Sequence, residues 1–179
     1  MKPPNGKYQL FNGKIDSQDK LTNIQINSFQ DGYETVLLPI AFVLWRFASQ
    51  KNSNPYGPFL MDSDTMQSIM STLHKTHNFS QGYKKENIRN SLAIRSDWSH
   101  LNWRVKIKLQ KPTVAYVGKV GYQAKVDYDY DNTLPFGGSD TISKVMEERR
   151  GDKTQIVIPR FSSMPFINEW AIIEVFVHI

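Results

Sequence analysis

Residues 36–61 read VLLPIAFVLWRFASQKNSNPYGPFLM, an apolar run that carries a single arginine, Arg46, and then enters a segment rich in proline and glycine. β-Branched and aromatic residues are dense in the run and Pro39 stands inside it, which favours a buried strand over about residues 40–49 rather than a helix. Side chains alternate between the two faces of a strand, so we expect Arg46 to share a face with Leu44 and other apolar residues. A guanidinium in such surroundings requires a partner, because it does not lose its charge. Three arrangements stay open: a structural ion pair, a side chain that extends to water at the edge of the sheet, or a clamp on the phosphate or carboxylate of a ligand in a cleft.

Length and composition indicate a globular protein. The chain has 179 residues, of which 40% are hydrophobic and 22% are charged, and a chain of this size buries about 70% of its unfolded surface. No apolar run approaches the roughly 20 residues that span a bilayer, and the N-terminus lacks the apolar core of a secretory signal. We therefore expect a soluble protein with no membrane partner, formed by an N-terminal arm over residues 1–30 and a single catalytic-type domain over residues 31–179. The cellular location stays unknown from these features.

The periodicity of apolar residues predicts an α+β fold with a few helices in the first half and mainly antiparallel strands in the second. One helix is expected over residues 65–77, after Asp62 and Asp64, which would cap it, and a shorter helix over residues 85–92. Residues 141–153, TISKVMEERRGDK, are expected to form a further helix or an excursion at the rim of an active site. Strands are expected over residues 102–109, 113–117, 120–128, 154–159 and 171–178.

The net charge of +5 permits three kinds of partner: nucleic acid, an acidic inhibitor protein or a phosphorylated small molecule. In residues 104–111, RVKIKLQK, basic and apolar residues alternate, so we expect a half-buried strand with one basic face. A non-enzymatic alternative for the whole domain follows from this face. Together with Trp98 or Trp103 it could bind single-stranded nucleic acid through phosphate contacts and base stacking. The usual meaning of such a short run of charges is a solvated surface, and that interpretation stays open.

Cysteine and histidine usage limits the chemistry further. The absence of cysteine excludes disulfide bonds and thiolate catalysis. Among the four histidines one close pair occurs, His74 and His77, and no acidic ligand stands near it, so we expect no metal site. A ribonuclease that uses His74, His77 or His100 is a third interpretation.

Six short motifs follow one another from about residue 40 to the C-terminus. They are Trp45-Arg46, Gly57-Pro58-Phe59-Leu60, Ser91-Leu92-Ala93-Ile94, Pro112 to Gly118 with Gln123, Phe136-Gly137-Gly138, and Gln155-Ile156-Val157-Ile158-Pro159. In this order they resemble the motifs of NAD-processing toxin domains, namely the ADP-ribosyltransferase-like effectors of bacterial competition systems and the NAD glycohydrolases of the tuberculosis necrotizing toxin type. The sequence has no Glu-x-Glu pair, so within this resemblance Gln155 would take the place of the glutamate that holds the nicotinamide ribose. A glutamine forms hydrogen bonds but is no general base near neutral pH, which suits a dissociative cleavage.

The resemblance implies a fold, a substrate and a site. The fold would be an ADP-ribosyltransferase-like split β core, and NAD would be consumed as a substrate by cleavage of the nicotinamide–ribose bond, with hydrolysis and ADP-ribosyl transfer both open. Arg46 would hold the diphosphate and Gln155 the ribose, as the two catalytic residues. An aromatic wall and closely approaching glycines would bind the rest of NAD, namely Tyr56, Gly57, Phe59, Gly137 and Gly138. The implied partners are an acidic immunity protein and a protein or nucleic-acid acceptor, and the implied route is delivery into the cytoplasm of a target cell by a secretion system.

Overall fold

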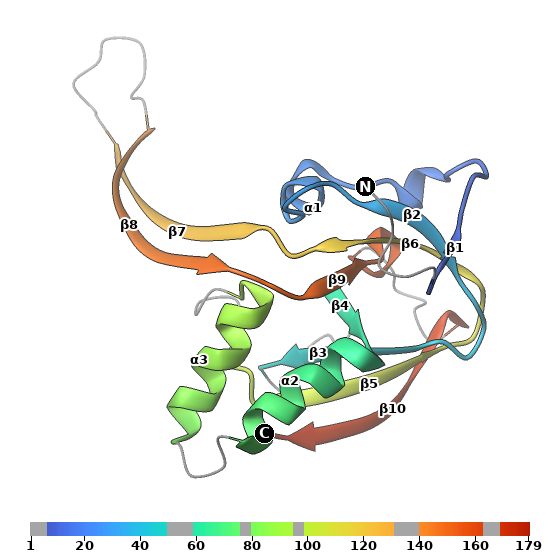
Figure 1. The fold of residues 1–179 in the computed structure, drawn as a ribbon. Coiled ribbons are helices and arrows are strands. Elements are labelled where there is room, and N and C mark those ends of the chain that lie inside the picture. Colours follow the sequence, from blue (N-terminus) through green and yellow to red (C-terminus); the bar gives the residue numbers. More distant parts are fainter. Residues whose placement is uncertain (1–6, 50–58, 76–79, 95–98, 131–139, 163–168) are drawn as a thin grey trace.

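The computed structural model describes residues 7–49, 59–75, 80–94, 99–130, 140–162 and 169–179. Over these residues the chain forms an α+β fold in which the strands pair antiparallel. Figure 1 shows helices α2 and α3 beside one part of the main sheet, and a two-stranded ribbon that extends away from it. The strands are β1 (Gln9–Leu10), β2 (Glu34–Leu38), β3 (Val43–Ala48), β4 (Phe59–Asp62), β5 (Trp103–Leu109), β6 (Thr113–Lys119), β7 (Tyr122–Tyr130), β8 (Asp140–Arg150), β9 (Thr154–Val157) and β10 (Ala171–His178). The helices are α1 (Asn23–Asn27), α2 (Ser63–Lys75) and α3 (Gln81–Leu92), with short 3-10 turns at Ser17–Asp19 and Pro159–Ser162.

Eight strands form one sheet in the order β1-β2-β6-β9-β4-β3-β5-β10, and β7 pairs with β8 separately. Strands β1 to β4 come from the first half of the chain, so the expectation that strands gather mainly in the second half is wrong. The apolar run contributes to two strands, because the chain turns between β2 and β3 at Pro39, whose carbonyl accepts from the Phe42 amide over 3.2 Å. Ala41 within this turn has a φ of 65°. A proline donates no ladder hydrogen bond, and here it stands where the ladder of β2 has ended.

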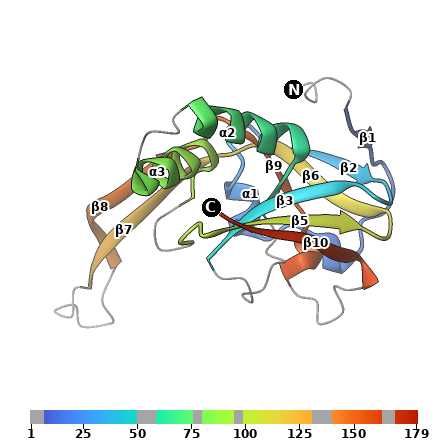
Figure 2. The same cartoon turned by 90° about the horizontal axis from the view of Figure 1, so that it is seen from below.

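The helix expected over residues 141–153 is a strand for most of its length. β8 pairs with β7 from Asp140, opposite Tyr130, to Arg150, opposite Tyr122. The Lys, Glu and Arg residues of this segment favour a helix only weakly, and pairing with a neighbouring strand outweighs that preference. Strands β7 and β8 form the ribbon that leaves the body of the molecule in Figures 1 and 2.

The other expected elements are confirmed, with small shifts at their ends. The strand expected over about residues 40–49 corresponds to β3, and the helix expected over residues 65–77 corresponds to α2. The five later strands correspond to β5, β6, β7, β9 and β10. Asp62 caps α2 as expected, because its Oδ1 accepts from the Thr65 amide over 2.8 Å. Helix α3 begins earlier than expected, since the Ser80 hydroxyl accepts from the Tyr83 amide. None of the helices in the described part of the chain is long and apolar enough to cross a membrane.

Buried apolar side chains lie on both faces of the sheet. One cluster extends across the eight-stranded sheet from β2 at one side to β10 at the other and includes Leu44, Val105 and Ile156. A second cluster includes Phe47 and Met61, which pack with apolar residues of α2 and α3, the helices that Figure 2 shows along one side of the strands. The alternation predicted for β3 is confirmed, because Leu44 belongs to the first cluster and Phe47 to the second.

The N-terminal segment packs on the sheet through β1, which pairs with β2, and through the buried rings of Tyr8 and Phe29. Asp19 is buried and accepts two hydrogen bonds from the guanidinium of Arg160, at 2.8 and 2.6 Å. Arg160 in turn lies over the ring of Trp170, with 4.1 Å between Cζ and the ring centroid. A paired and stacked arginine of this kind connects the first 20 residues to the segment that follows β9.

Candidate functional site

Four of the six sequence motifs lie on four adjacent strands. The sheet carries β6, β9, β4 and β3 next to one another in that order. The motif residues on them are Thr113 to Gly118 on β6, Gln155 to Val157 on β9, Phe59-Leu60 on β4 and Trp45-Arg46 on β3. Gly118 and Gln155, which belong to different motifs, are directly opposite each other on the ladder. Segments that are far apart in the sequence therefore meet in one part of the sheet.

Arg46 stands near the end of β3, opposite Val105 of the neighbouring strand. It lies two residues after Leu44, so both belong to the face of the first apolar cluster. The Nε atom of Arg46 is buried, and burial lowers the pKa of Arg46 to about 10. An anion that reaches this guanidinium would meet a cation that little water screens.

Gln155 is 6% exposed, and its amide nitrogen donates to both the carbonyl oxygen and the hydroxyl of Ser28, each over 2.8 Å. Ser28 ends α1, where its hydroxyl donates to the Gln25 carbonyl over 2.6 Å. Its carbonyl also accepts from the Gly121 amide over 2.6 Å. Gln155 therefore ties β9 to the end of α1. Because the amide protons of Gln155 go to Ser28, a ligand would have to use its amide oxygen.

Arg46 and Gln155 point to opposite faces of the sheet. Residues directly opposite on paired strands share a face, and neighbours along one strand alternate. The registers of β3, β4 and β9 put Leu44 and Ile156 on the same face, in one buried cluster. Arg46, two residues after Leu44, is on that face, and Gln155, next to Ile156, is on the other. The structure thus does not bring the two predicted catalytic side chains together on one face.

Phe59 is 37% exposed and opposite Val157, so it lies on the same face as Gln155. These two predicted site residues are therefore brought together, on the adjacent strands β4 and β9. The remaining predicted NAD-binding residues lie outside the described residues, namely Tyr56, Gly57, Gly137 and Gly138.

The basic face predicted for residues 104–111 is confirmed on β5, where partly exposed and buried residues alternate. Lys106 and Lys108 approach one carboxylate, that of Glu174 on β10, at 2.7 and 3.7 Å. The hydrogen bond from Lys106 lowers the pKa of Glu174. A phosphate backbone would have to compete with Glu174 for these two lysines, so this face gives the nucleic-acid interpretation little support.

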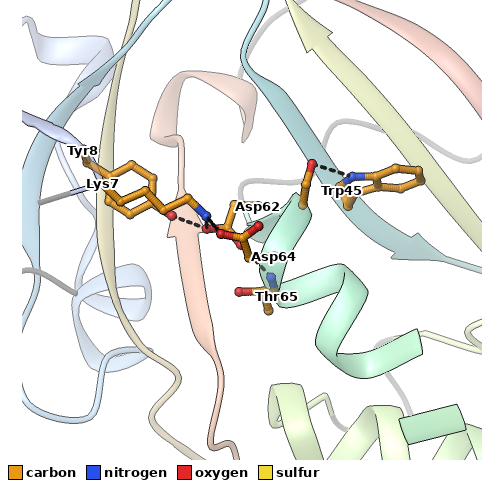
Figure 3. A network of polar contacts seen from close by, with 7 residues as sticks. Lys7, Tyr8, Trp45, Asp62, Asp64 and Thr65 are labelled. Carbon is orange, nitrogen blue, oxygen red and sulfur yellow. Dashed lines mark hydrogen bonds and ion pairs between the residues drawn. The ribbon is translucent and has the colours of Figure 1, made fainter. Parts of the chain in front are cut away.

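A polar network that the sequence did not predict holds the start of α2 to the N-terminal segment (Figure 3). Asp62, 5% exposed, accepts hydrogen bonds from Lys7 Nζ over 2.7 Å, from the Tyr8 hydroxyl and from the Thr65 amide, and Lys7 also pairs with Asp64. Burial alone would raise the pKa of Asp62, but these hydrogen bonds outweigh it and the pKa is lowered. Burial and the bond to Asp62 raise the pKa of Tyr8. The network fixes β4, the strand beside Arg46.

No protein-family model and no curated protein matches this chain. Among solved structures, Rhs1-CT in complex with its cognate immunity protein RhsI1 is similar to it. The TM-score is 0.47 at 12% sequence identity, over 84% of this chain and 84% of that chain. A likeness of this extent carries no conclusion about function.

Proposed function

We propose that this chain is a toxin-type enzyme domain that consumes NAD by cleaving the nicotinamide–ribose bond. The observation that carries the proposal is the meeting of four NAD-toxin-like motifs on β6, β9, β4 and β3. Their order along the sequence is what resembles the NAD-processing toxins, and their adjacency in the sheet is what a shared site requires. In the proposal this part of the sheet is the split β core of an ADP-ribosyltransferase-like fold, with the short strand β4 joining β9 to β3.

In this proposal, Arg46 binds the diphosphate of NAD. Its guanidinium is desolvated among apolar neighbours, and β3 leads directly into the segment that carries Tyr56 and Gly57. A planar guanidinium donates two parallel hydrogen bonds to phosphate oxygens, which would fix the dinucleotide relative to the sheet. Positioning of this kind contributes to the rate only when the reacting bond is held in line with its acceptor.

The chemical step needs few protein groups. The bond between ribose C1′ and the pyridinium nitrogen breaks, and its electron pair leaves with nicotinamide as a neutral molecule. The remaining oxocarbenium-like C1′ is attacked by water, which gives ADP-ribose and a proton, or by a protein or nucleic-acid acceptor, which gives an ADP-ribosylated product. The two outcomes differ in the acceptor alone, and both belong to the proposal.

Gln155 has a more limited part in this proposal than the resemblance implies. Its amide nitrogen is held by Ser28 and its side chain faces away from that of Arg46. We therefore assign Gln155 the positioning of β9 against α1, and we assign it no contact with the NAD molecule that Arg46 binds.

The test is the rate of nicotinamide release from NAD by the wild-type chain and by Arg46→Lys. Lysine keeps the charge but loses the planar fork, so kcat/KM should fall by about ten- to a hundredfold, the equivalent of one charge-assisted hydrogen bond of about 1.5–3 kcal/mol. Thermal unfolding should change little. Lys119→Gln, at an exposed position on β6, is the control and should keep full activity. Normal turnover of Arg46→Lys combined with a large fall in Tm would instead show that Arg46 stabilises the fold and does not bind NAD.

A protein partner belongs to the same proposal. The resemblance implies an immunity protein that protects the producing cell, and the net charge of +5 favours an acidic one. Such a complex should weaken steeply with added salt.

A further inference from the structure

A hollow of about 260 Å³ lies between α2, α3 and the adjoining ends of β5 and β10. Figures 1 and 2 show the end of β10 beside these two helices. Its walls combine an apolar part, formed by Met70 and Leu73, with nitrogen-bearing side chains from three different elements. These side chains are His74 on α2, Gln81 and Lys84 on α3, and Arg104 on β5. His178 of β10 also borders the hollow, but it is opposite Trp103 on the ladder and its ring packs edge-on against that of Trp103, on the other face of the sheet.

The chemistry of the hollow is that of an anion site. The side chains of two cations, one imidazole and one amide line it, and no acidic side chain is among the described residues that do so. Each of these groups donates hydrogen bonds, and guanidinium and ammonium groups are the usual ligands of phosphate. The basic residues of β5 are therefore not equivalent, because Lys106 and Lys108 are occupied by Glu174 while Arg104 faces the hollow.

The surroundings of Arg104 are a second reason to expect an anion in this hollow. Its Nε atom is buried and has no hydrogen-bond partner among the described residues. The guanidinium lies over the ring of Trp45, with 5.5 Å between Cζ and the ring centroid, so the aromatic face stabilises the charge from one side but accepts no N–H bond in its plane. A buried donor without a partner costs free energy, and an anion in the hollow, close to the same guanidinium, would offset this cost by stabilising its charge.

The size of the hollow limits the ligand. Small-ligand pockets have volumes of roughly 300–1,000 Å³, and this hollow, at about 260 Å³, lies just below that range, so we expect a ligand no larger than one nucleotide unit. It is also separate from Arg46. Arg104 is opposite Phe47 on the ladder between β5 and β3, whereas Arg46 is opposite Val105, so the two arginines point to opposite faces of the sheet.

We propose that this hollow binds the phosphate of a nucleoside monophosphate unit, either as a free nucleotide or as a unit of an RNA chain. Lys84 and Arg104 bind the phosphate oxygens, His74 donates a further hydrogen bond, and the apolar wall at Met70 and Leu73 contacts the nucleoside. The site adds to the proposed NAD site and shares no residue with it.

The test is calorimetric titration of the purified chain with 5′-AMP, with adenosine and with a short single-stranded RNA. Saturable binding of 5′-AMP or of the RNA, with none of adenosine, is expected, and the tighter of the two identifies the source of the nucleotide unit. Arg104→Gln and Lys84→Gln should each weaken this binding about tenfold or more, since each removes a charge-assisted hydrogen bond. Lys75→Gln, which removes a neighbouring cation of α2 that does not line the hollow, should bind as the wild type does.

Three results would overturn the proposal: no binding of either phosphate ligand, equal binding of adenosine, or unchanged affinity in both variants. Lys84 lies on the surface of α3, so we expect Lys84→Gln to fold. If Arg104→Gln does not fold, the affinity of Lys84→Gln alone still tests the proposal. Release of nicotinamide plays no part in this titration. A failed NAD assay and a failed nucleotide titration therefore lead to separate conclusions.

Discussion

Gln155→Ala is expected to destabilise the fold because it removes both hydrogen bonds to Ser28. Both are buried and 2.8 Å long, and such a bond contributes about 0.5–1.5 kcal/mol. The Ser28 carbonyl keeps its bond from Gly121 and the hydroxyl keeps its bond to Gln25, so the larger penalty for an orphaned buried group does not apply. With the lost packing included, we expect a decrease of about 2–3 kcal/mol in the free energy of unfolding, or a fall in Tm of about 4–12 °C.

Gln155→Glu distinguishes a structural role from a role in binding ribose. A carboxylate has no proton to donate to the Ser28 carbonyl, and at a position that is 6% exposed its charge would be poorly solvated. The variant should therefore be at least as unstable as Gln155→Ala. A side chain whose main partner is a ribose hydroxyl would behave differently, since a carboxylate accepts that proton equally well.

The assay is urea unfolding followed by tryptophan fluorescence, for the two Gln155 variants, Ser28→Ala and the double variant Ser28→Ala/Gln155→Ala. A double-mutant cycle should give a coupling of about 1 kcal/mol, the bond that the hydroxyl and the amide share. Nicotinamide release is measured on the same samples well below their Tm. Unchanged stability of Gln155→Ala with a coupling near zero and a large loss of turnover would refute the structural assignment and return Gln155 to the catalytic site.

The remaining predictions concern the network at Asp62 and the close contact at Gly118. Asp62→Asn should lower the free energy of unfolding by about 1–3 kcal/mol near neutral pH, because it weakens the bonds from Lys7 and Tyr8; an unchanged urea midpoint would argue against this. Since the folded pKa of Asp62 is lowered, its stabilisation is fully present above the unfolded pKa of about 4 and is lost as the pH falls through the folded value. Wild type should therefore lose more stability than Asp62→Asn on acidification below about pH 5, and parallel curves of Tm against pH would contradict this. Gly118→Ala would place a methyl group 2.6 Å from the Gly32 carbonyl oxygen and 2.7 Å from Phe29 Cδ1, so Tm should fall by an amount equivalent to about 1–3 kcal/mol; an unaltered Tm would show that these neighbours yield freely.

The sequence predicted correctly those strands and helices in which buried and exposed residues recur at one regular spacing. β5 alternates strictly and α2 repeats its apolar residues at helical spacing, so both could be predicted within a few residues. β8 could not, because its charged residues are compatible with a helix and its pairing with β7 is a tertiary effect. β2 was missed because the apolar run continues across Pro39 without a change in composition.

The candidate site was predicted in part. The apolar surroundings of Arg46 follow from alternation along one strand, which the sequence shows directly. The partner of Gln155 is Ser28, 127 positions away, and Tyr8 meets Asp62 across 54 positions; neither contact leaves a local signal. That Arg46 and Gln155 face opposite sides depends on the registers of β3, β4 and β9, where a shift of one residue would reverse the result.

The measurement that tests the central claim most directly is incubation of the purified wild-type chain with NAD that carries an isotopic label in the nicotinamide ring. We predict that labelled nicotinamide is released in proportion to time and enzyme, as ADP-ribose accumulates in solution or on an added acceptor, and that Arg46→Lys releases it at least about ten times more slowly. Intact NAD after prolonged incubation with folded wild-type protein, with and without protein and nucleic-acid acceptors, would contradict the claim that this domain consumes NAD.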